Sequence, residues 1–319
     1  MSPSETDLVR MLSEGPVGIE TIATELATSR SCVREQLDTL ASQGYELTQE
    51  QDRYRLVGVP FDRLEALPWS APPHLTVELH DSLASTNARA RRLGEKGELP
   101  AVVVGKRQTE GRGRRDRAWA SPPGGLYLSL AWAPKLPADH LGVLTLAAGV
   151  EVHRALFERD VPAAIKWPND VHLEGDEEAK LAGILAETHR GSTGERWTVV
   201  GIGINANTDP ADLPTRGESV RSIRGSPIDR RTLATELIQG LLTEVFDREA
   251  IRAAWIDRSS TLGRTVSIET TDDRMVGRAK SIDDTGALLV ETETGRQRIA
   301  VGDCRYLRST QSSTERDDP

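Results

Sequence analysis

The chain has little cysteine, few aromatic residues and no long apolar run. Its two cysteines, Cys32 and Cys304, lie near opposite ends of the 319 residues, and its six histidines never take a metal-ligand spacing such as HExxH. This pattern argues against a disulfide framework and a bound metal, and it favours a reduced, cytoplasmic protein. Because no apolar run approaches a membrane span and residues 1–30 lack a signal-peptide core, we expect no membrane partner.

Lysine is also scarce, since only six of the 40 basic residues are lysines and the formal net charge is −9. An acid-rich, arginine-rich composition fits a high-salt cytosol, but a GC-rich genome also favours arginine, so both explanations stay open. Binding to nucleic acid depends on neutralising phosphates. This charge is therefore unusual for a protein that contacts DNA.

The most informative segment is Lys166-Trp167-Pro168-Asn169-Asp170, which is flanked by apolar, strand-like residues. Proline fixes the backbone and removes a donor, so we expect Lys166 at the end of a sheet on a stiff support. An ordinary turn is the alternative interpretation.

A second cluster is the run Gly-Arg-Gly-Arg-Arg-Asp-Arg at residues 111–117, followed by Trp119. Glycine lets backbone N–H groups approach an anion, and arginine supplies planar, bidentate donors. The loop suits a triphosphate or an acyl phosphate, although its spacing is not that of a Walker loop. Trp119 offers a flat face for a purine base, or it belongs to the core. A solvated basic loop or a weak RNA-binding tract is the alternative.

Together with three further motifs, these clusters resemble the biotin protein ligase family. The further motifs stand in the family's order and at similar spacing, and Gln108 precedes the arginine loop as it does there. They are Ser85-Thr86-Asn87, the run KLAGILAE at residues 180–187 and the run GIGIN at residues 201–205. The resemblance implies an ATP-dependent ligase that forms biotinyl-5'-AMP and transfers biotin to a lysine of a biotin carboxyl carrier protein. ATP with Mg²⁺ and biotin are then substrates, and no tightly bound cofactor is expected.

The resemblance also implies roles for individual residues. Lys166 would bind the biotin carboxylate and the phosphate that it attacks, with Arg112 and Arg114 closing over the ligand as the other catalytic residues. The biotin pocket would comprise Ser85, Thr86, Asn87, Gln108, Arg112, Lys166, Gly183, Gly201 and Gly203. The ATP and adenylate site would comprise Arg112, Arg114, Arg115, Arg117, Trp119, Asn169, Lys180 and Asn205.

Some of these residues have a simpler interpretation. Ser85-Thr86-Asn87 is also a helix N-cap pattern, and the two roles are compatible. Glycine at three pocket positions leaves room for a bicyclic ring, but Gly201 and Gly203 alternatively allow close strands. Asp116 stands where the family usually has glycine. It either pairs with a neighbouring arginine and orders the loop, or weakens nucleotide binding.

The order of helical and strand-like runs predicts a multidomain α/β protein. We expect a winged helix-turn-helix at residues 1–60, a proline-rich linker at 61–73 and a catalytic domain with a mixed sheet at 74–258. An SH3-like barrel follows at 259–308, with a disordered tail at 309–319. The resemblance implies the class II aminoacyl-tRNA synthetase fold for the catalytic domain.

Within the catalytic domain, apolar periodicity predicts helices at residues 86–95, 140–159 and 231–248. Strands are predicted at residues 75–79, 101–106, 126–132, 180–188 and 197–205.

The N-terminal module raises the question of DNA binding. The exposed side of its third helix carries Arg30, Ser31 and Arg34, which we predict to contact operator DNA in a major groove. Residues 1–60 nevertheless carry ten acidic and five basic residues. A helical protein-interaction or dimerisation module is therefore the alternative.

Four functions follow from the sequence. The first is a ligase that is also a biotin-responsive transcriptional repressor and, by resemblance, forms a homodimer when the adenylate is bound. The others are a ligase whose N-terminal module does not bind DNA, a biotin sensor without transfer activity, and a lipoate ligase. The arginine loop and the Lys166–Asp170 motif count against the last two.

Overall fold

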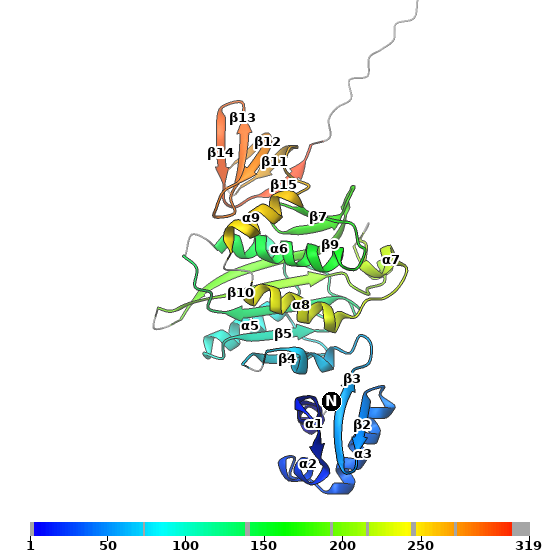
Figure 1. The fold of residues 1–319 in the computed structure, drawn as a ribbon. Coiled ribbons are helices and arrows are strands. Elements are labelled where there is room, and N and C mark those ends of the chain that lie inside the picture. Colours follow the sequence, from blue (N-terminus) through cyan, green and yellow to red (C-terminus); the bar gives the residue numbers. More distant parts are fainter. Residues whose placement is uncertain are drawn as a thin grey trace, which may run out of the picture.

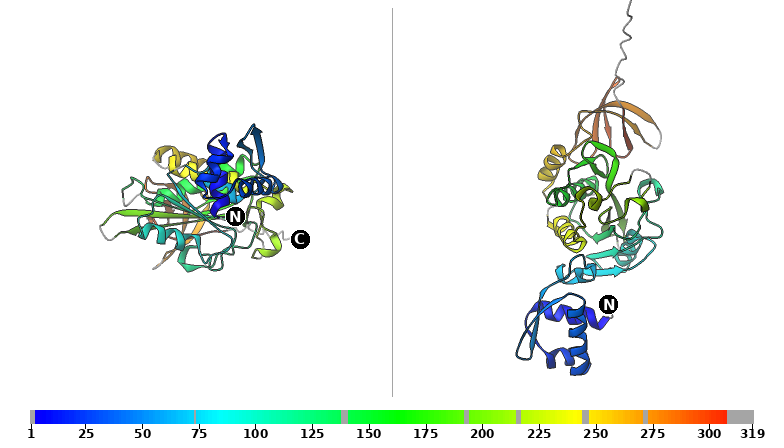
Figure 2. Two further views of the ribbon diagram at one scale, coloured as in Figure 1. Left: turned by 90° about the horizontal axis from the view of Figure 1, so that it is seen from below. Right: turned by 90° about the vertical axis from the view of Figure 1, so that its right-hand side faces the viewer.

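The structure is a computed structural model that describes residues 3–72, 74–137, 141–191, 194–214, 217–243, 247–270 and 273–307. The predicted tail at 309–319 lies outside these residues. The described chain forms three sheets of three, seven and five strands. They follow one another along the molecule in chain order, from the N-terminal unit through a large central unit to the C-terminal unit (Figures 1 and 2). No helix in the described part of the chain is long and apolar enough to cross a membrane.

The N-terminal unit has three helices packed on a small antiparallel sheet of order β1-β3-β2. Ser29 caps the third helix, and its hydroxyl accepts a hydrogen bond from the Cys32 amide at 3.2 Å. Apolar residues of the three helices meet in one core that includes Leu8, Ile22 and Leu40. The elements are α1 (Pro3–Glu14), β1 (Val17–Gly18), α2 (Ile19–Glu25), α3 (Arg30–Ser42), β2 (Glu46–Glu50) and β3 (Arg53–Gly58).

The central unit is built on a seven-stranded mixed sheet of order β4-β5-β6-β10-β9-β8-β7. The β4–β5 pair is parallel and the other pairs are antiparallel. The strands are β4 (Thr76–His80), β5 (Ala101–Gly105), β6 (Leu126–Trp132), β7 (Ala163–Lys166), β8 (Asp170–Leu173), β9 (Asp176–Arg190) and β10 (Arg196–Ile204). The sheet's mixed character and the five predicted strands are confirmed.

Helices cover both faces of this sheet. Alternate residues of β5 point to opposite sides, so Val103 packs with Leu93 and Trp197 in one core, while Val102 and Val104 belong to the larger core. The helices are α5 (Thr86–Glu95), α6 (Leu141–Phe157), α7 (Val220–Arg224), α8 (Arg230–Thr243) and α9 (Arg248–Asp257).

The prediction of one helix over residues 231–248 is wrong at its end. Helix α8 ends at Thr243, and a separate helix, α9, begins at Arg248. Asp247 caps α9 by accepting a hydrogen bond from the Ala250 amide at 2.9 Å. The cap satisfies a backbone donor at the start of α9. The apolar periodicity alone did not reveal that a second helix begins here.

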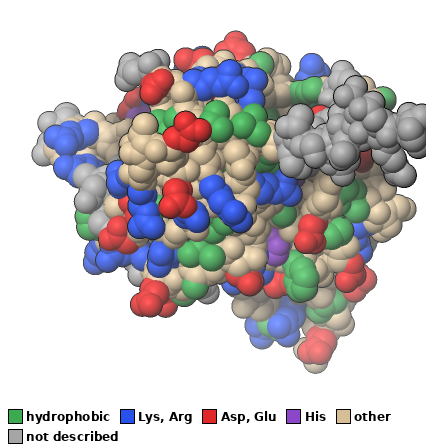
Figure 3. All heavy atoms as spheres, turned by 90° about the horizontal axis from the view of Figure 1, so that it is seen from above, with side chains coloured by type: hydrophobic (Ala, Val, Ile, Leu, Met, Phe, Trp, Pro, Cys, Tyr) green, Lys and Arg blue, Asp and Glu red, His purple; other side chains and the backbone are tan. Residues whose placement is uncertain are grey.

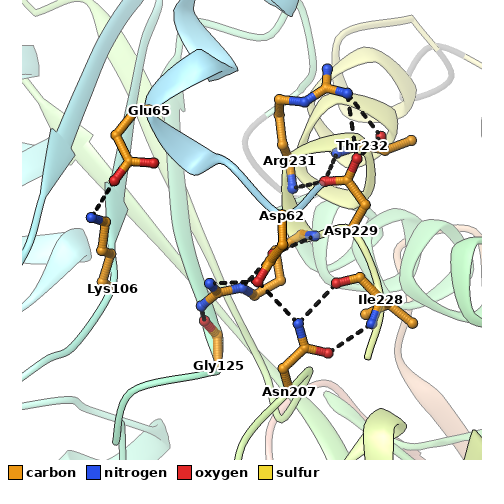
Figure 4. Close-up of polar contacts among 10 residues, drawn as sticks. Asp62, Glu65, Lys106, Gly125, Asn207, Ile228, Asp229, Arg231 and Thr232 are labelled. Atoms are coloured by element: carbon orange, nitrogen blue, oxygen red, sulfur yellow. Dashed lines mark hydrogen bonds and ion pairs between the residues drawn. The ribbon is translucent and has the colours of Figure 1, made fainter. Parts of the chain in front are cut away.

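The predicted linker contains a short helical segment, η1 (Leu64–Ala66) continuing into α4 (Leu67–Ser70). Leu64 and Leu67 belong to the core of the central unit, whereas Ala66 packs in the N-terminal core. The carboxylate of Asp62 accepts hydrogen bonds from Arg230 Nε and Nη2, each at 2.8 Å. These contacts join the linker to the start of α8 (Figure 4).

The C-terminal unit is an antiparallel sheet of order β14-β13-β12-β11-β15. Its strands are β11 (Thr265–Glu269), β12 (Arg274–Ile282), β13 (Leu288–Thr292), β14 (Gly295–Ile299) and β15 (Asp303–Tyr306). Trp167 is buried where this unit meets the central one, and its indole Nε1 donates to the Gly286 carbonyl at 3.2 Å. The tryptophan of the central motif is therefore an anchor between the two units.

Candidate functional site

Most of the predicted site residues surround one pocket of about 200 Å³ on the central sheet. They come from the start of α5, the arginine loop, the β7–β8 turn and the facing strands β9 and β10. The predicted residues in its lining are Ser85, Thr86, Asn87, Gln108, Arg112, Arg114, Arg117, Trp119, Asn169, Lys180, Gly183, Gly201 and Gly203. The structure therefore brings five separate sequence motifs together. Lys166, Arg115 and Asn205 are the predicted residues that it places elsewhere.

A polar network fixes one wall of the pocket. Gln108 Oε1 accepts hydrogen bonds from the Thr86 amide at 2.8 Å and from the Thr86 hydroxyl at 3.1 Å. Asn87 Nδ2 donates to Glu187 Oε2 at 2.7 Å, and its Oδ1 accepts from the Ser129 hydroxyl at 2.6 Å. Ser129 and Glu187 were not predicted as site residues. They hold Asn87, and only the pairing of distant strands reveals them.

Ser85 at the rim of this wall also caps a helix. Its hydroxyl accepts a hydrogen bond from the Ala88 amide at 3.4 Å, at the start of α5. The capping interpretation is thus confirmed, and it is compatible with a position in the pocket lining.

The three glycines predicted to line the biotin site give space to protein side chains. A Cβ at Gly203 would lie 2.6 Å from Trp119 Nε1, and one at Gly183 would lie 3.1 Å from Trp119 Cζ3. A Cβ at Gly201 would overlap Asn87 Oδ1. In this structure the glycines therefore admit Trp119 and Asn87, and room for a bicyclic ring beside them stays a prediction.

Trp119 lies inside the pocket. Its ring packs beneath Lys180, whose Nζ is 4.8 Å from the ring centroid, and its buried Nε1 has no hydrogen-bond partner among the described residues. Pockets for drug-sized ligands usually measure about 300–1,000 Å³. At about 200 Å³, this pocket is smaller than that range while the indole occupies part of it.

An ion pair closes the adjacent side of the pocket. Lys180 Nζ lies 2.7 Å from Asp170 Oδ1, and the Asp170 side chain is 25% exposed. Burial alone would raise the pKa of Asp170, but His172 and Lys180 together lower it to about 2. Asp170 is the last residue of the Lys166–Asp170 motif, and it was not predicted to bind a ligand. It is a fixed negative charge that aligns Lys180.

Two asparagines predicted near the nucleotide have backbone partners. Asn169 Nδ2 donates to the Ile184 carbonyl at 2.9 Å, which ties the β7–β8 turn to β9. Asn205 Nδ2 donates to the carbonyls of Lys180 at 3.0 Å and Glu218 at 3.1 Å. Asn205 does not line the pocket and holds the strand segment that presents Lys180.

The arginine loop is bound to the C-terminal unit. Arg114 Nη1 donates to the Gly302 carbonyl at 3.0 Å, and Arg117 Nη2 lies 3.0 Å from Asp303 Oδ1. Arg115 lies 3.3 Å from Asp303 Oδ2 and also donates to the Glu269 carbonyl at 3.0 Å. Arg115 is therefore occupied by β11 and β15 and does not line the pocket.

Asp116 is the position where this loop departs from the family pattern. Its backbone φ is +53°, as is that of Arg115, in the left-handed region that glycine adopts most readily. Aspartate tolerates this region better than most residues, which explains how it replaces glycine. Its Oδ1 lies 4.0 Å from Arg112 Nη1, so the predicted pairing with a neighbouring arginine is confirmed.

Lys166 lies at the boundary of the pocket and not in its lining. It is the register partner of Asp170, but its Nζ lies 4.5 Å from the ring centroid of Tyr306 in β15. Burial lowers the pKa of Lys166, and the nearby carboxylate of Asp170 opposes that shift. The side chain faces a neighbouring cavity in this structure, and its role in catalysis stays a prediction.

The predicted DNA-contact residues lie on the exposed side of α3. Arg30, Ser31 and Arg34 are all exposed, and Arg30 is paired with Glu20 of α2. A phosphate contact by Arg30 would therefore have to replace this ion pair.

The described residues contain no cluster of acidic, histidine or cysteine side chains that could hold a metal ion. Both cysteines are free, and burial raises the pKa of the Cys304 thiol to about 12. Cys304 is thus protonated and unreactive at neutral pH.

Comparison with known proteins decides the family. Residues 81–205 match the biotin/lipoate A/B protein ligase family, and residues 261–305 match the biotin protein ligase C terminal domain. The bifunctional ligase/repressor BirA of Bacillus subtilis (strain 168) is 30% identical over 319 residues, covering 93% of this chain and 97% of its own. The chain belongs to the biotin protein ligase family.

Further members are similar over part of the chain. The biotin–[acetyl-CoA-carboxylase] ligase of Paracoccus denitrificans is 34% identical over 237 residues, covering 69% of this chain and 95% of its own. Among solved structures, the biotin protein ligase from Aquifex aeolicus in complex with biotin and ATP superposes with a TM-score of 0.61 at 27% identity. That match covers 73% of this chain and 99% of the other. The family membership indicated by the sequence motifs is confirmed.

Proposed function

We propose that this chain activates biotin with ATP and transfers it to a lysine of a biotin carboxyl carrier protein. The observation that carries the proposal is the convergence of the five family motifs on one pocket, with the arginine loop at its mouth. The Paracoccus relative is a ligase for acetyl-CoA carboxylase, which makes the carrier domain of such a carboxylase the expected acceptor.

The reaction has two steps. In the first, a carboxylate oxygen of biotin attacks the α-phosphorus of ATP, the bond to the bridging oxygen breaks, and pyrophosphate leaves. In the second, the uncharged acceptor amine attacks the acyl carbon, AMP leaves, and the amine gives up a proton to solvent. Both nucleophiles belong to the substrates, so the enzyme needs no nucleophile of its own. Mg²⁺ would enter with ATP and offset the charge of its phosphates.

The side chains around the pocket then serve to position substrates and stabilise charge. Thr86, Asn87 and Gln108 would contact biotin from the wall that is already fixed by hydrogen bonds. Arg112 and Arg114 would meet the phosphates, while Trp119 would leave its place beside the glycines and stack on adenine.

Lys166 would act at the reacting groups. Its flexible four-carbon stem lets Nζ turn from Tyr306 toward Asp170, its neighbour across the β7–β8 pair. There it would lie between the carboxylate of biotin and the α-phosphate. Asp170 would keep Lys180 beside the nucleotide.

We further propose that the N-terminal unit is a winged helix that binds operator DNA and that the chain is also a biotin-responsive repressor. The Bacillus relative is a bifunctional ligase/repressor, and the alignment with it spans 93% of this chain. Arg30, Ser31 and Arg34 of α3 would contact the major groove, and a homodimer with bound adenylate would place two such helices on one operator. The C-terminal sheet would be the SH3-like barrel of the family.

Biotin-dependent exchange of labelled pyrophosphate into ATP tests the first step directly. Exchange that requires biotin, and that lipoate does not support, is the expected result; exchange with lipoate alone would overturn the choice of substrate. Operator binding is tested by comparing the wild type with Arg34→Glu. This variant should lose affinity for DNA, and its pyrophosphate exchange should stay unchanged.

A further inference from the structure

A second cavity of about 470 Å³ adjoins the pocket along the edge of the central sheet. Lys166 and Ala164, two residues apart on β7, both line it. Their register partners on β8 are Asp170, which lines the pocket, and His172, which lines the cavity. Residues two apart on a strand share a face, so the cavity and the pocket adjoin on this face of the sheet.

The walls of the cavity are positively charged. Its lining has three arginines and one lysine against two carboxylates, before either histidine is protonated, and one of the arginines, Arg154, is paired with Glu151. The charged residues are Arg154, Lys166, Arg258, Arg264, Glu174 and Asp257. On the molecular face seen from the C-terminal end, lysine and arginine side chains are interspersed with acidic ones (Figure 3). A concave site lined by charges of one sign concentrates ions of the opposite sign.

Two histidines in the cavity have buried nitrogens without partners. The His172 side chain is only 8% exposed, and its Nε2 lies 3.9 Å from Asp170 Oδ2, which is beyond hydrogen-bond distance. Neither ring nitrogen therefore has a hydrogen-bond partner among the described residues. The buried Nδ1 of His153 is also unpartnered within the part of the chain that the structure describes. Buried polar atoms without partners are rare and costly. A ligand that accepts hydrogen bonds would pair with the protonated nitrogen of each ring.

Tyr306 holds two of the cations in place. Its ring centroid lies 4.5 Å from Lys166 Nζ and 4.6 Å from the guanidinium carbon of Arg264. The ring itself is fixed, because the phenol oxygen lies 2.9 Å from the Ser260 hydroxyl and 3.1 Å from that of Thr261. Two like charges near one ring repel each other, and an anion bound in the cavity would offset this repulsion.

We propose that this cavity is a subsite for inorganic pyrophosphate, the leaving group of the adenylation step. The inference rests on the proposed function and adds the place to which the leaving group goes. When the carboxylate oxygen bonds to the α-phosphorus, the bond on the opposite side breaks, and pyrophosphate leaves with the electron pair of that bond. Lys166, at the boundary between the pocket and the cavity, would neutralise charge on the α-phosphate and on the leaving pyrophosphate. The arginines and histidines beyond it would receive the two phosphate groups.

Calorimetric titration of the full-length protein with sodium pyrophosphate tests the subsite without any turnover. We expect one saturable site, about tenfold tighter than for inorganic phosphate at the same ionic strength. His172→Gln and Arg264→Gln should each weaken pyrophosphate binding about tenfold and leave biotin binding unchanged. Lys280→Gln is the matched control, because Lys280 pairs with Glu291 on β12 and β13 and does not line the cavity.

Unchanged pyrophosphate binding in both cavity variants would refute the subsite. Loss of pyrophosphate binding in Arg112→Ala alone would also refute it, because the anion would then lie on the arginine loop. Absence of saturable binding would refute it as well. Should His172→Gln fail to fold, His153→Gln takes its place. A wild type that biotinylates a carrier without binding pyrophosphate would overturn the subsite alone. Cavity-dependent binding in a protein without transfer activity would support the anion site and overturn the proposed function.

Discussion

The carboxylate of Asp303 in β15 accepts a hydrogen bond from Arg117 at 3.0 Å, although the two residues are 186 positions apart. Asp303 also pairs with Arg115, so one side chain of the C-terminal unit holds two arginines of the loop that covers the pocket. This contact ties the C-terminal sheet to the loop at the mouth of the pocket.

Asp303→Asn should loosen the arginine loop. Both arginines are partly exposed, so we expect a small effect on stability, below about 1 kcal/mol. The Michaelis constant for ATP should rise roughly tenfold, because the loop must then be ordered by the ligand alone. Steady-state kinetics of pyrophosphate exchange give the result, with Glu291→Gln as the control for an exposed ion pair of the same sheet. An unchanged Michaelis constant for ATP would show that the contact between Asp303 and the arginine loop has no catalytic role.

Lys166→Met should abolish adenylate formation while the protein stays folded. Methionine keeps the aliphatic stem and its packing on Tyr306 but removes the charge at the boundary of the two cavities. A single well-placed donor lost at a reacting centre typically costs about 10²–10³ in rate. Single-turnover formation of labelled biotinyl-AMP measures this, and Lys280→Met is the control. Formation at the wild-type rate would remove Lys166 from the mechanism.

Trp119→Ala should affect the binding of biotin and the binding of ATP differently. Removing the indole frees the space beside Gly183 and Gly203, so biotin should bind at least as tightly as in the wild type. ATP should bind about tenfold more weakly, because stacking on a base contributes about 1–3 kcal/mol. Equilibrium titrations with each substrate distinguish these effects. Weaker biotin binding with unchanged ATP binding would mean that the indole contacts biotin and not adenine.

The acid stability of the fold should depend on Asp170. Its pKa is lowered in the folded state to about 2, below the usual value of 3.8, so the unfolded chain binds the proton more tightly. The stabilisation is therefore present above about pH 4 and is lost as the pH falls toward 2. With a quarter of the side chain exposed, we expect it to be on the order of 1–2 kcal/mol. Urea unfolding of the wild type and Asp170→Asn between pH 5 and 2 checks this, since the variant should lose less stability.

Asp62→Ala should loosen the N-terminal unit. Asp62 joins the linker to Arg230 and to Asn207, which follows the pocket strand β10 (Figure 4). Leaving the half-buried Arg230 without its carboxylate should cost roughly 2–3 kcal/mol. Hydrogen exchange of the Leu64–Ser70 segment should accelerate, whereas that of α3 should not. Equal protection in variant and wild type would show that the apolar contacts of Leu64 and Leu67 hold the segment.

The sequence predicted most helices and strands well, because they follow from local patterns, and the motifs shared with the family meet at one pocket. Strands β5, β6 and β10 end within one residue of their predicted bounds, since their apolar runs are bounded by turn residues. The break between α8 and α9 was missed, because the apolar stripe continues across it and hides the cap at Asp247.

The contacts that orient the side chains proposed to act in catalysis were not predictable in the same way. The position of Lys166 depends on Tyr306, and that of the arginine loop on Asp303, each far away in the chain. Gly203 indicated that a ligand or a neighbouring strand lies close to the backbone, but the group that lies there is the Trp119 side chain. Such partners become visible only when the strands and the C-terminal unit are placed in space.

Transfer of biotin to a purified biotin carboxyl carrier domain is the most direct test of the central claim. The full-length protein, Mg-ATP and biotin should label the carrier so that streptavidin detects it, and Lys166→Met should not. A parallel reaction with lipoate should give no labelling. A folded wild-type protein that leaves the carrier unlabelled, also at molar salt, would contradict the account and leave a biotin sensor without transfer activity.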